Sequence, residues 1–403
     1  MALNNETIKY SLRNLKMRKA RSFLTILSIF VGISAIFIFV SFGLGLYNYV
    51  GEFTTGGSAD KVIIHSRGGG VPGLDDTFKL TEKDVKAIER VSGVFEVTGS
   101  SFAVAEIKKS NEKKFVFISS YDPKIPLIFE ISNVDIIKGR ELNSKESGKA
   151  ILGYNYLIDD KIFSKGMGLN DNLDLQGQKT RVVAYLESIG NPQDDSNIYV
   201  TQEYFDELYV DRAGNFGWII ARVDIENIDK VVEDIERALR KERGLEIGKE
   251  DFHVQSFEEL IASFSGALNI IIGFVILIAL ISVLVSAVNT ANTMITSVIE
   301  RTKEIGIIKA VGAKNSELLK IFLFESAMLG FIAGIIGVLV GFMITSFVNS
   351  VLINLGWGFL SPYYSLELFI GCVLFATGTG AISGVIPAIR ASKINTVEAL
   401  RYE

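Results

Sequence analysis

The sequence predicts a membrane α-helical protein with four transmembrane helices, and an α+β extracytoplasmic domain of two subdomains inserted between helices 1 and 2. The 403 residues are 48% hydrophobic, which is too apolar for an ordinary soluble protein, yet 22% of them are charged. The hydrophobic and the charged residues are separated along the chain: long apolar runs flank one large region, and this region holds most of the acidic residues.

Four apolar runs are each long enough to cross a bilayer, which takes about 20 residues. They predict transmembrane helices at residues 23–46, 266–299, 321–355 and 366–389. The last two are separated by "GWGFLSPYYS", whose glycine, proline and aromatic residues indicate a turn at the membrane interface.

Lysine and arginine predict the orientation, because they concentrate in short cytoplasmic segments. Residues 1–22, predicted to form a cytoplasmic amphipathic helix, contain six of them, the 300–320 segment contains five and the tail 390–403 contains three. The turn between the third and fourth runs contains none. We therefore expect a multi-pass protein of the cell membrane with both termini in the cytoplasm and residues 47–265 outside.

The region predicted to lie outside is acidic and contains no cysteine. It holds 27 of the 41 basic and 38 of the 46 acidic residues, so its net charge is −11 and that of the remaining chain is +6. Such a domain does not suit nucleic acid. The single cysteine, Cys372, lies in the fourth run, so we expect the outer domain to be held by its own core without a disulfide.

Strand and helix patterns occur at both ends of the outer region. "DKVIIH" alternates like a strand, a helix capped by Thr81 and stopped by Gly93 follows, and "VFEVTGSSFAVAEIKK" and "KFVFISSYD" each predict one strand. A further strand, helix and strand precede residue 257. We predict one subdomain from the flanks 47–120 and 216–265, with 121–215 as the inserted subdomain.

No catalytic, cofactor-binding or metal-binding constellation is visible in the sequence. His65 and His253 are far apart along the chain, and each is better explained as a strand residue than as a ligand. The pairs Asp159–Asp160 and Asp194–Asp195 lack the spacing of a calcium loop and suit solvated turns. The common zinc, redox and nucleophile motifs are missing, so we expect a non-catalytic subunit.

The second apolar run follows a predicted helix start. Ser256 and Glu259 form a capping box, from which one helix runs to about Glu300, roughly 65 Å at 1.5 Å per residue. That length exceeds the hydrocarbon thickness, so we expect part of this helix to form a stalk outside the bilayer.

The apolar runs contain few ionisable residues. Glu325 lies near one end of the third run and Glu367 lies at the edge of the fourth, which argues against an ion-coupled carrier. Glycines spaced along the third and fourth runs instead predict close helix packing.

Between the second and third runs lies a charged segment, "VIERTKEIGIIKAVGAKNSEL". We predict an amphipathic helix with Ile305, Ile307, Ile308 and Val311 on one face, ended by Gly312. Such a helix either lies on lipid or docks in a protein groove.

Three stretches resemble the permeases of MacB/FtsX-type ABC transporters. They are "NTMITSVIERTKEIGIIKAVGAKNSELLKIFLFES", the tail "GVIPAIRASKINTVEALRYE" and the start "SLRNLKMRKARSFLTILSIFVGISA". The tail has Asn395–Thr396 where this family often has proline. Four spans with a large insert after the first agree with the resemblance.

The resemblance implies a permease homodimer that binds two copies of a separate ABC ATPase. ATP and magnesium would then belong to the ATPase, and this chain, which lacks a G-x-x-x-x-G-K-[ST] motif, would need no cofactor. The charged segment would be the coupling helix. The motif positions are Glu300, Arg301, Thr302, Glu304, Gly306, Lys309 and Gly312, and Ile305, Ile307 and Ile308 would enter the ATPase groove with Glu304 and Lys309 at its rim.

Two functions remain open at this point. The first is an export permease that transmits motion from the ATPase to an outer domain, which handles a peptide, antibiotic or lipoprotein together with an extracytoplasmic adaptor or substrate protein. The alternative is an FtsX-like transducer that activates a cell-wall hydrolase without transport. The size of the outer region favours export, and an anchored enzyme is disfavoured by the missing catalytic residues.

Overall fold

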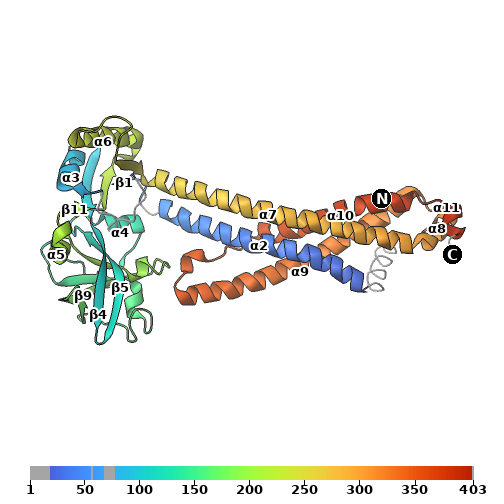
Figure 1. The fold of residues 1–403 in the computed structure, drawn as a ribbon, viewed down its shortest axis with the longest axis horizontal. Coiled ribbons are helices and arrows are strands. Elements are labelled where there is room, and N and C mark those ends of the chain that lie inside the picture. Colours follow the sequence, from blue (N-terminus) through green and yellow to red (C-terminus); the bar gives the residue numbers. More distant parts are fainter. Residues whose placement is uncertain (1–18, 56–57, 68–77, 402–403) are drawn as a thin grey trace. The chain divides into compact units, whose positions relative to one another are not determined.

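The computed structural model describes residues 19–55, 58–67 and 78–401 (Figure 1). Most of the predicted N-terminal amphipathic helix, residues 1–18, lies outside the described residues. The chain divides into two compact units. The first comprises Met1–Leu46, Leu268–Val351 and Leu360–Glu403, and the second comprises Tyr47–Ala267 and Leu352–Phe359.

Within the described residues, four helices are long and apolar enough to cross a membrane, which confirms the predicted fold class. They are α2 (Lys19–Thr55), α7 (Phe257–Glu300), α9 (Asn315–Leu355) and α10 (Leu366–Ser392). Two short helices, α8 (Thr302–Ala310) and α11 (Thr396–Arg401), complete the first unit. The four long helices are longer than the predicted spans, because helical turns that contain polar residues continue them beyond the apolar runs.

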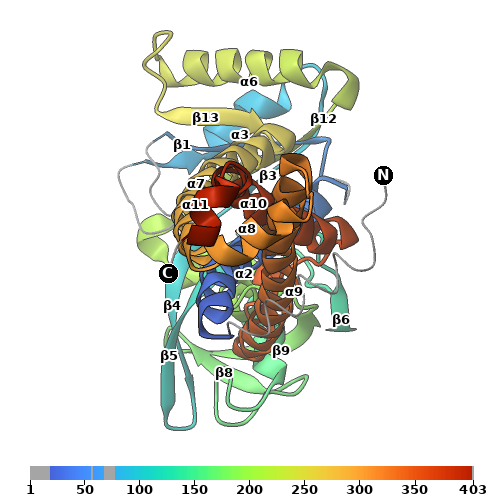
Figure 2. The same cartoon turned by 90° about the vertical axis from the view of Figure 1, so that its right-hand side faces the viewer.

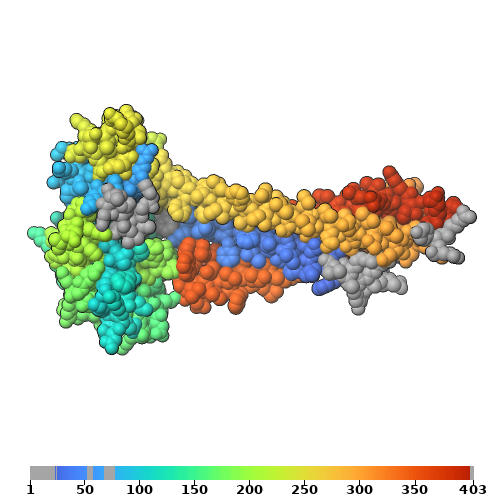
Figure 3. All heavy atoms as spheres, in the orientation of Figure 1, coloured from blue at the N-terminus to red at the C-terminus, as the bar shows by residue number. Residues whose placement is uncertain are grey.

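Small residues set the packing of the membrane helices. The Ser286 hydroxyl donates to the Ser28 carbonyl between α7 and α2, and the Ser34 hydroxyl donates to the Gly337 carbonyl between α2 and α9. The space-filling view shows α2 lying between α7 and α9 (Figure 3). Between α9 and α10, a Cβ atom on Gly330 or Gly380 would collide with backbone of the facing helix, so these glycines permit the close approach.

The second unit contains a four-stranded antiparallel sheet and a larger seven-stranded sheet. The first has the order β13-β1-β12-β3 and the second the order β6-β9-β7-β10-β5-β4-β8, and β8 also pairs with β9. The four-stranded sheet is formed by β1 (Lys61–Ser66), β3 (Val94–Ser100), β12 (Trp218–Val223) and β13 (Phe252–Ser256). The seven-stranded sheet is formed by β4 (Phe102–Lys109), β5 (Glu112–Tyr121), β6 (Ile136–Gly139), β7 (Lys149–Leu152), β8 (Asn172–Leu175), β9 (Gln178–Leu186) and β10 (Ile198–Thr201).

Helices pack against these sheets, and two short strands pair with each other as a separate two-stranded sheet. Helices α3 (Glu82–Glu89) and α6 (Ile228–Arg243) cover one face of the four-stranded sheet, where Ile88, Val231 and Ile235 pack on its buried residues (Figure 2). Thr81 begins α3 in a capping box with Asp84, and Gly93 follows it at φ +92°, as predicted. The remaining elements are β2 (Leu80–Thr81), α4 (Leu127–Ser132), α5 (Gln202–Leu208) and β11 (Asn215–Phe216).

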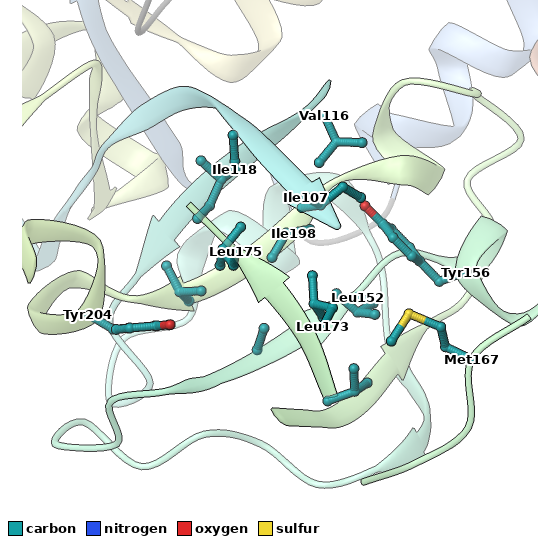
Figure 4. Packing of buried hydrophobic residues seen from close by; sticks show 14 of the residues in the cluster. Ile107, Val116, Ile118, Leu152, Tyr156, Met167, Leu173, Leu175, Ile198 and Tyr204 are labelled. Atoms are coloured by element: carbon teal, nitrogen blue, oxygen red, sulfur yellow. The ribbon is translucent and has the colours of Figure 1, made fainter. Parts of the chain in front are cut away.

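The seven-stranded sheet encloses its own apolar core. Ile107, Ile118, Leu152 and Leu175 are fully buried there, and the Tyr156 and Tyr204 rings fill its edges (Figure 4). A second cluster joins α4 to residues of both sheets, including Ile63 and Ile220.

The boundary between the subdomains lies earlier than the predicted residue 120, because β4 and β5 belong to the seven-stranded sheet. The stretch 94–109 was predicted as one strand, but it divides at Ser101 into β3 and β4. Gly99 lies two residues before this break but inside β3, and no proline occurs there. Instead, the Ser101 amide donates to the Ser120 hydroxyl and the Ser100 hydroxyl donates to the Ser120 carbonyl, so side chains satisfy the backbone where the chain changes sheets.

Candidate functional site

The candidate site is the α8 segment, which we define as residues 300–314. It begins where α7 ends at Glu300, because Arg301 leaves helical geometry and the Thr302 hydroxyl donates to the Ile299 carbonyl. The helix within this segment stops before Gly312, whose φ of +108° suits glycine and whose amide donates to the Lys309 carbonyl. The predicted helix and its stop at Gly312 are confirmed.

Arg301 holds the corner between α7 and α8 from inside. Its side chain is only 5% exposed, and its guanidinium lies 3.1 Å from the Glu304 carboxylate and 3.3 Å from the Glu325 carboxylate of α9. The guanidinium carbon also lies 5.6 Å from the centre of the Phe322 ring. A buried arginine paired in this way fixes the direction in which α8 leaves α7.

Lys309 fixes the other end of α8. Its ammonium donates to the Ser392 and Ile394 carbonyls, each at 2.8 Å. These carbonyls lie at the C-terminus of α10, where a cation is favourable for the unpaired carbonyls and the helix dipole. The sequence placed Lys309 at the rim of a partner groove, whereas in the structure it connects α8 to α10.

The apolar residues of α8 do not share one face. Ile305 is 2% exposed and packs with Met294, Leu318 and Ala388, and Ile308 packs partly on the same cluster. Ile307 is 50% exposed. Because each residue turns about 100° around a helix, residues two positions apart point to nearly opposite sides, which the predicted face overlooked.

The predicted residues therefore form an inward and an outward group. Gly306 is buried with Arg301 and Ile305, while Glu300, Glu304 and Gly312 are exposed with Ile307. Thr302 is half-buried. The assignment of these residues to a partner interface stays a prediction.

Sequence reasoning placed Val311 on the apolar face of the helix without naming it among the interface residues, and it did not consider Val397. Val311, at the end of α8, is 86% exposed, and Val397 is exposed on α11, which packs beside α8 (Figure 2). The valine two residues before Ala399 in the tail "KINTVEALR" was the signal for the second of these.

The second unit offers no comparable site among its described residues. In the structured part of the chain, no group of three or more histidine, cysteine, aspartate or glutamate side chains is placed to hold a metal ion. Asp195 accepts from the amides of Ile189 and Gly190 and from the Ser188 hydroxyl, so it organises its own loop. Burial raises its pKa, and these hydrogen bonds act in the opposite direction.

Comparison with known proteins gives two family matches. Residues 22–238 match the MacB-like periplasmic core domain, and residues 276–396 match the FtsX-like permease C-terminal family. The α8 segment lies within the second match.

Relatives are similar along the whole chain. An uncharacterized ABC transporter permease of Methanocaldococcus jannaschii is 34% identical over 99% of this chain and 98% of its own length. The uncharacterized ABC transporter permease YknZ of Bacillus subtilis is 24% identical over 99% of both chains. The macrolide export ATP-binding/permease protein MacB of Wolinella succinogenes is also 24% identical, and this chain spans 61% of its length.

Two solved structures resemble part of the chain. The periplasmic region of MacB from Actinobacillus actinomycetemcomitans covers 53% of this chain and 97% of its own, with 13% identity and a TM-score of 0.42. The extracellular domain of the transporter YknZ covers 48% of this chain and 99% of its own, with 16% identity and a TM-score of 0.39.

Proposed function

Because the chain belongs to the ABC transporter permeases with a MacB-like periplasmic core domain and an FtsX-like C-terminal region, we propose that it transmits motion from a separate cytoplasmic ATPase to an extracytoplasmic domain. In this proposal the second unit lies outside the cell, and both termini and the α8 segment face the cytoplasm. The lysines and arginines beside the membrane helices support that orientation.

The observation that carries the proposal is the construction of the α8 segment. Its inner side is fixed to α9 and α10 by Arg301 and Lys309, while Ile307 and Val311 project outward without cover from the described chain. A helix anchored in this way cannot yield to a push without moving its neighbours. Exposed apolar residues on such a helix suit a groove on a partner protein.

The long helix α7 supports transmission. It runs without interruption from Phe257 to Glu300, and its 44 residues correspond to about 66 Å. The hydroxyl of Ser256 accepts from the Glu259 amide, and the Glu259 carboxylate accepts from the Ser256 amide, which confirms the predicted capping box. The residue that ends β13 therefore also begins this helix.

The proposed complex contains two permease chains and two ATPases. ATP and magnesium bind to the ATPase, membrane lipid covers the outward side chains of the membrane helices, and the outer domain handles a peptide, antibiotic or lipoprotein. Support for export comes from relatives named for macrolide and pyoverdine export.

The test is recovery of an ATPase from detergent. The permease is co-expressed with candidate soluble ABC ATPases from the same genome, and wild type is compared with Ile307→Asp and Val311→Asp. Burying one isoleucine side chain in the interface contributes about 1.5–3 kcal/mol to the free energy of association, which the variant loses. The new carboxylate adds a desolvation cost. Association should therefore fall at least roughly tenfold.

Val210→Asp is the matched control, because Val210 is 75% exposed but lies in the second unit. Equal recovery with all variants would show that α8 is not the docking site. Normal recovery of the ATPase together with hydrolase activation and no substrate movement would favour the transducer instead.

A further inference from the structure

The only two histidines of the chain are neighbours across two strands. His65 on β1 and His253 on β13 are direct partners in the antiparallel register, although 188 positions separate them. Their ring centroids lie 5.7 Å apart. The sequence suggested two unrelated strand residues, and the structure shows that both are strand residues but adjacent ones.

Hydrogen bonds define which nitrogen of His65 is available. Its Nδ1 lies 2.9 Å from the Ser66 carbonyl oxygen, which can only accept, so Nδ1 carries the proton. Its Nε2 lies 3.2 Å from the side-chain amide nitrogen of Gln255, which can only donate, so Nε2 carries a lone pair. Metal-bound histidines commonly have one ring nitrogen held by a carbonyl and coordinate through the other, which in His65 is Nε2 once the Gln255 amide turns away.

The pair lies on the sheet face opposite α3 and α6, beyond the part of that face where Ile63 is buried. Along β1 and β13, Ile64, Phe252 and Val254 point into the core beneath α3 and α6. His65 and His253 alternate with these residues, so they occupy the opposite face, where His65 is half-buried and His253 is exposed. Figure 2 shows β13 and β1 side by side at this part of the sheet.

The surroundings keep His65 in the state that metals require. Burial lowers its pKa below the ordinary 6.5, with a smaller contribution from the neighbouring His253, whereas the bond to Ser66 acts in the opposite direction. Histidine binds metals as the neutral imidazole, so no proton has to be displaced at neutral pH.

The separation of the rings also suits a shared ion. An imidazole nitrogen binds a divalent transition metal at about 2.0 Å, so two imidazoles in neighbouring positions on one ion have ring centroids roughly 4.5–5 Å apart. The observed 5.7 Å is close to this separation, so the two rings are near enough to share one ion. Gln255, which lies on the same face two residues after His253, offers an amide oxygen as a further donor.

We propose that His65 and His253 together bind one divalent transition-metal ion, Cu²⁺ more tightly than Zn²⁺, at the junction of β1 and β13. Two imidazoles leave coordination positions for Gln255, water or a small anion, and the preference for copper follows the usual order of affinities for nitrogen ligands. Because β13 leads directly into α7, a bound ion would fasten the strand before this helix to its neighbour.

The experiment titrates Cu²⁺ and Zn²⁺ into the purified full-length chain in detergent. The affinity tag must contain no histidine, so that His65 and His253 are the only imidazoles present. Calorimetry should give one strong Cu²⁺ equivalent, and electron paramagnetic resonance should show coupling to two imidazole nitrogens. His65→Gln and His253→Gln should each weaken Cu²⁺ binding at least tenfold and leave coupling to one imidazole.

The double variant His65→Gln/His253→Gln measures binding to other groups. Equal Cu²⁺ affinity in wild type and the double variant would overturn the proposal, as would a loss in only one of the single variants. Elution volume and helical content show whether each variant is folded. The count of imidazole nitrogens in wild type decides the question even where a variant does not fold, since coupling to fewer than two contradicts the site.

Discussion

Arg301 illustrates how a single side chain differs from its motif assignment. Its position within "ERTKEIG" placed it in a partner interface, yet the guanidinium faces Glu304, Glu325 and the Phe322 ring. The motif correctly located the corner between α7 and α8. It could not show which motif residues build the corner and which project from it, because that division depends on contacts with α9.

The buried ion pair of Arg301 and Glu325 predicts that single and double variants differ strongly in their free energy of unfolding. Arg301→Met should lower the free energy of unfolding by about 3–5 kcal/mol, because the Glu325 carboxylate stays buried without this cation. The double variant Arg301→Met/Glu325→Leu should recover most of that loss, since apolar pairs can replace buried ion pairs. Thermal unfolding in detergent measures both, and equal destabilisation by the single and double changes would contradict the explanation.

Glu250 predicts a dependence of stability on pH. The Arg240 guanidinium, followed by the amides of Glu250 itself and Gly248, holds the Glu250 pKa at about 2, below the ordinary 4.5. The folded state therefore binds this proton less readily than the unfolded state. The stabilisation is complete above pH 4.5 and is lost as the pH falls towards about 2.

Glu250→Gln should accordingly lose less stability than wild type between pH 4.5 and 2, as followed by thermal unfolding at a series of pH values. Glu246→Gln is the matched control, because Glu246 lies on the same loop and its side chain is largely exposed. The same pH slope in wild type and Glu250→Gln would count against this assignment.

At the scale of elements, the glycines of α10 differ in whether they contact a neighbouring helix, although the sequence pattern treats them as equivalent. A Cβ atom on Gly380 would meet the Ser326 carbonyl of α9, whereas one on Gly378 would meet nothing within 4 Å. Both were predicted as packing residues. The helical pattern predicted that glycines would mediate contacts, but the side on which each lies depends on where the neighbouring helix is.

Gly380→Ala should therefore destabilise the helix pair by about 1–3 kcal/mol, as overpacking usually does. Gly378→Ala should be neutral or stabilise by up to about 1 kcal/mol, because alanine favours helix more than glycine. Thermal unfolding in detergent compares the two. A larger loss in Gly378→Ala would show that this face of α10 is packed in the working protein.

Element starts and stops could be predicted better than element partners. The Thr81 and Ser256 caps and the Gly312 stop follow from local chemistry, so the sequence was sufficient for them. The division at Ser101 and the meeting of His65 with His253 depend on pairings between distant strands. No local pattern carries that information, whereas the face of α8 was assigned incorrectly because the helical period of about 100° per residue was not applied to Ile305 and Ile307.

At the scale of the whole molecule, the second unit should fold without the membrane helices. Its three buried apolar clusters come from residues 62–261, and no cysteine lies within that range. A fragment of residues 58–262 should unfold in one cooperative transition by circular dichroism. A gradual, non-cooperative loss of signal would mean that the unit depends on the remaining chain.

Two of the connections from the membrane helices into this unit, those through α2 and α7, differ in their chemistry. Between α2 and β1 the sequence contains Gly56 and Gly57, whereas from β13 into α7 no glycine or proline occurs between Phe252 and Ser265. If the proposed function is correct, inserting two glycines after Ser256 should abolish substrate export while ATP hydrolysis continues. The same insertion after Gly57 should be tolerated, and equal export by both variants would contradict this difference.

The sharing of Ser256 between β13 and α7 gives the second connection a high torsional stiffness. Every backbone dihedral from the strand into the first helical turn is fixed by pairing or by the cap, so no free rotation remains at this point. A twist of α7 about its axis cannot dissipate in a linker. If the proposed function is correct, the twist therefore appears in β13 and in β1, to which β13 is hydrogen-bonded, and the four-stranded sheet is where torque applied to this helix would be converted into a change of shape.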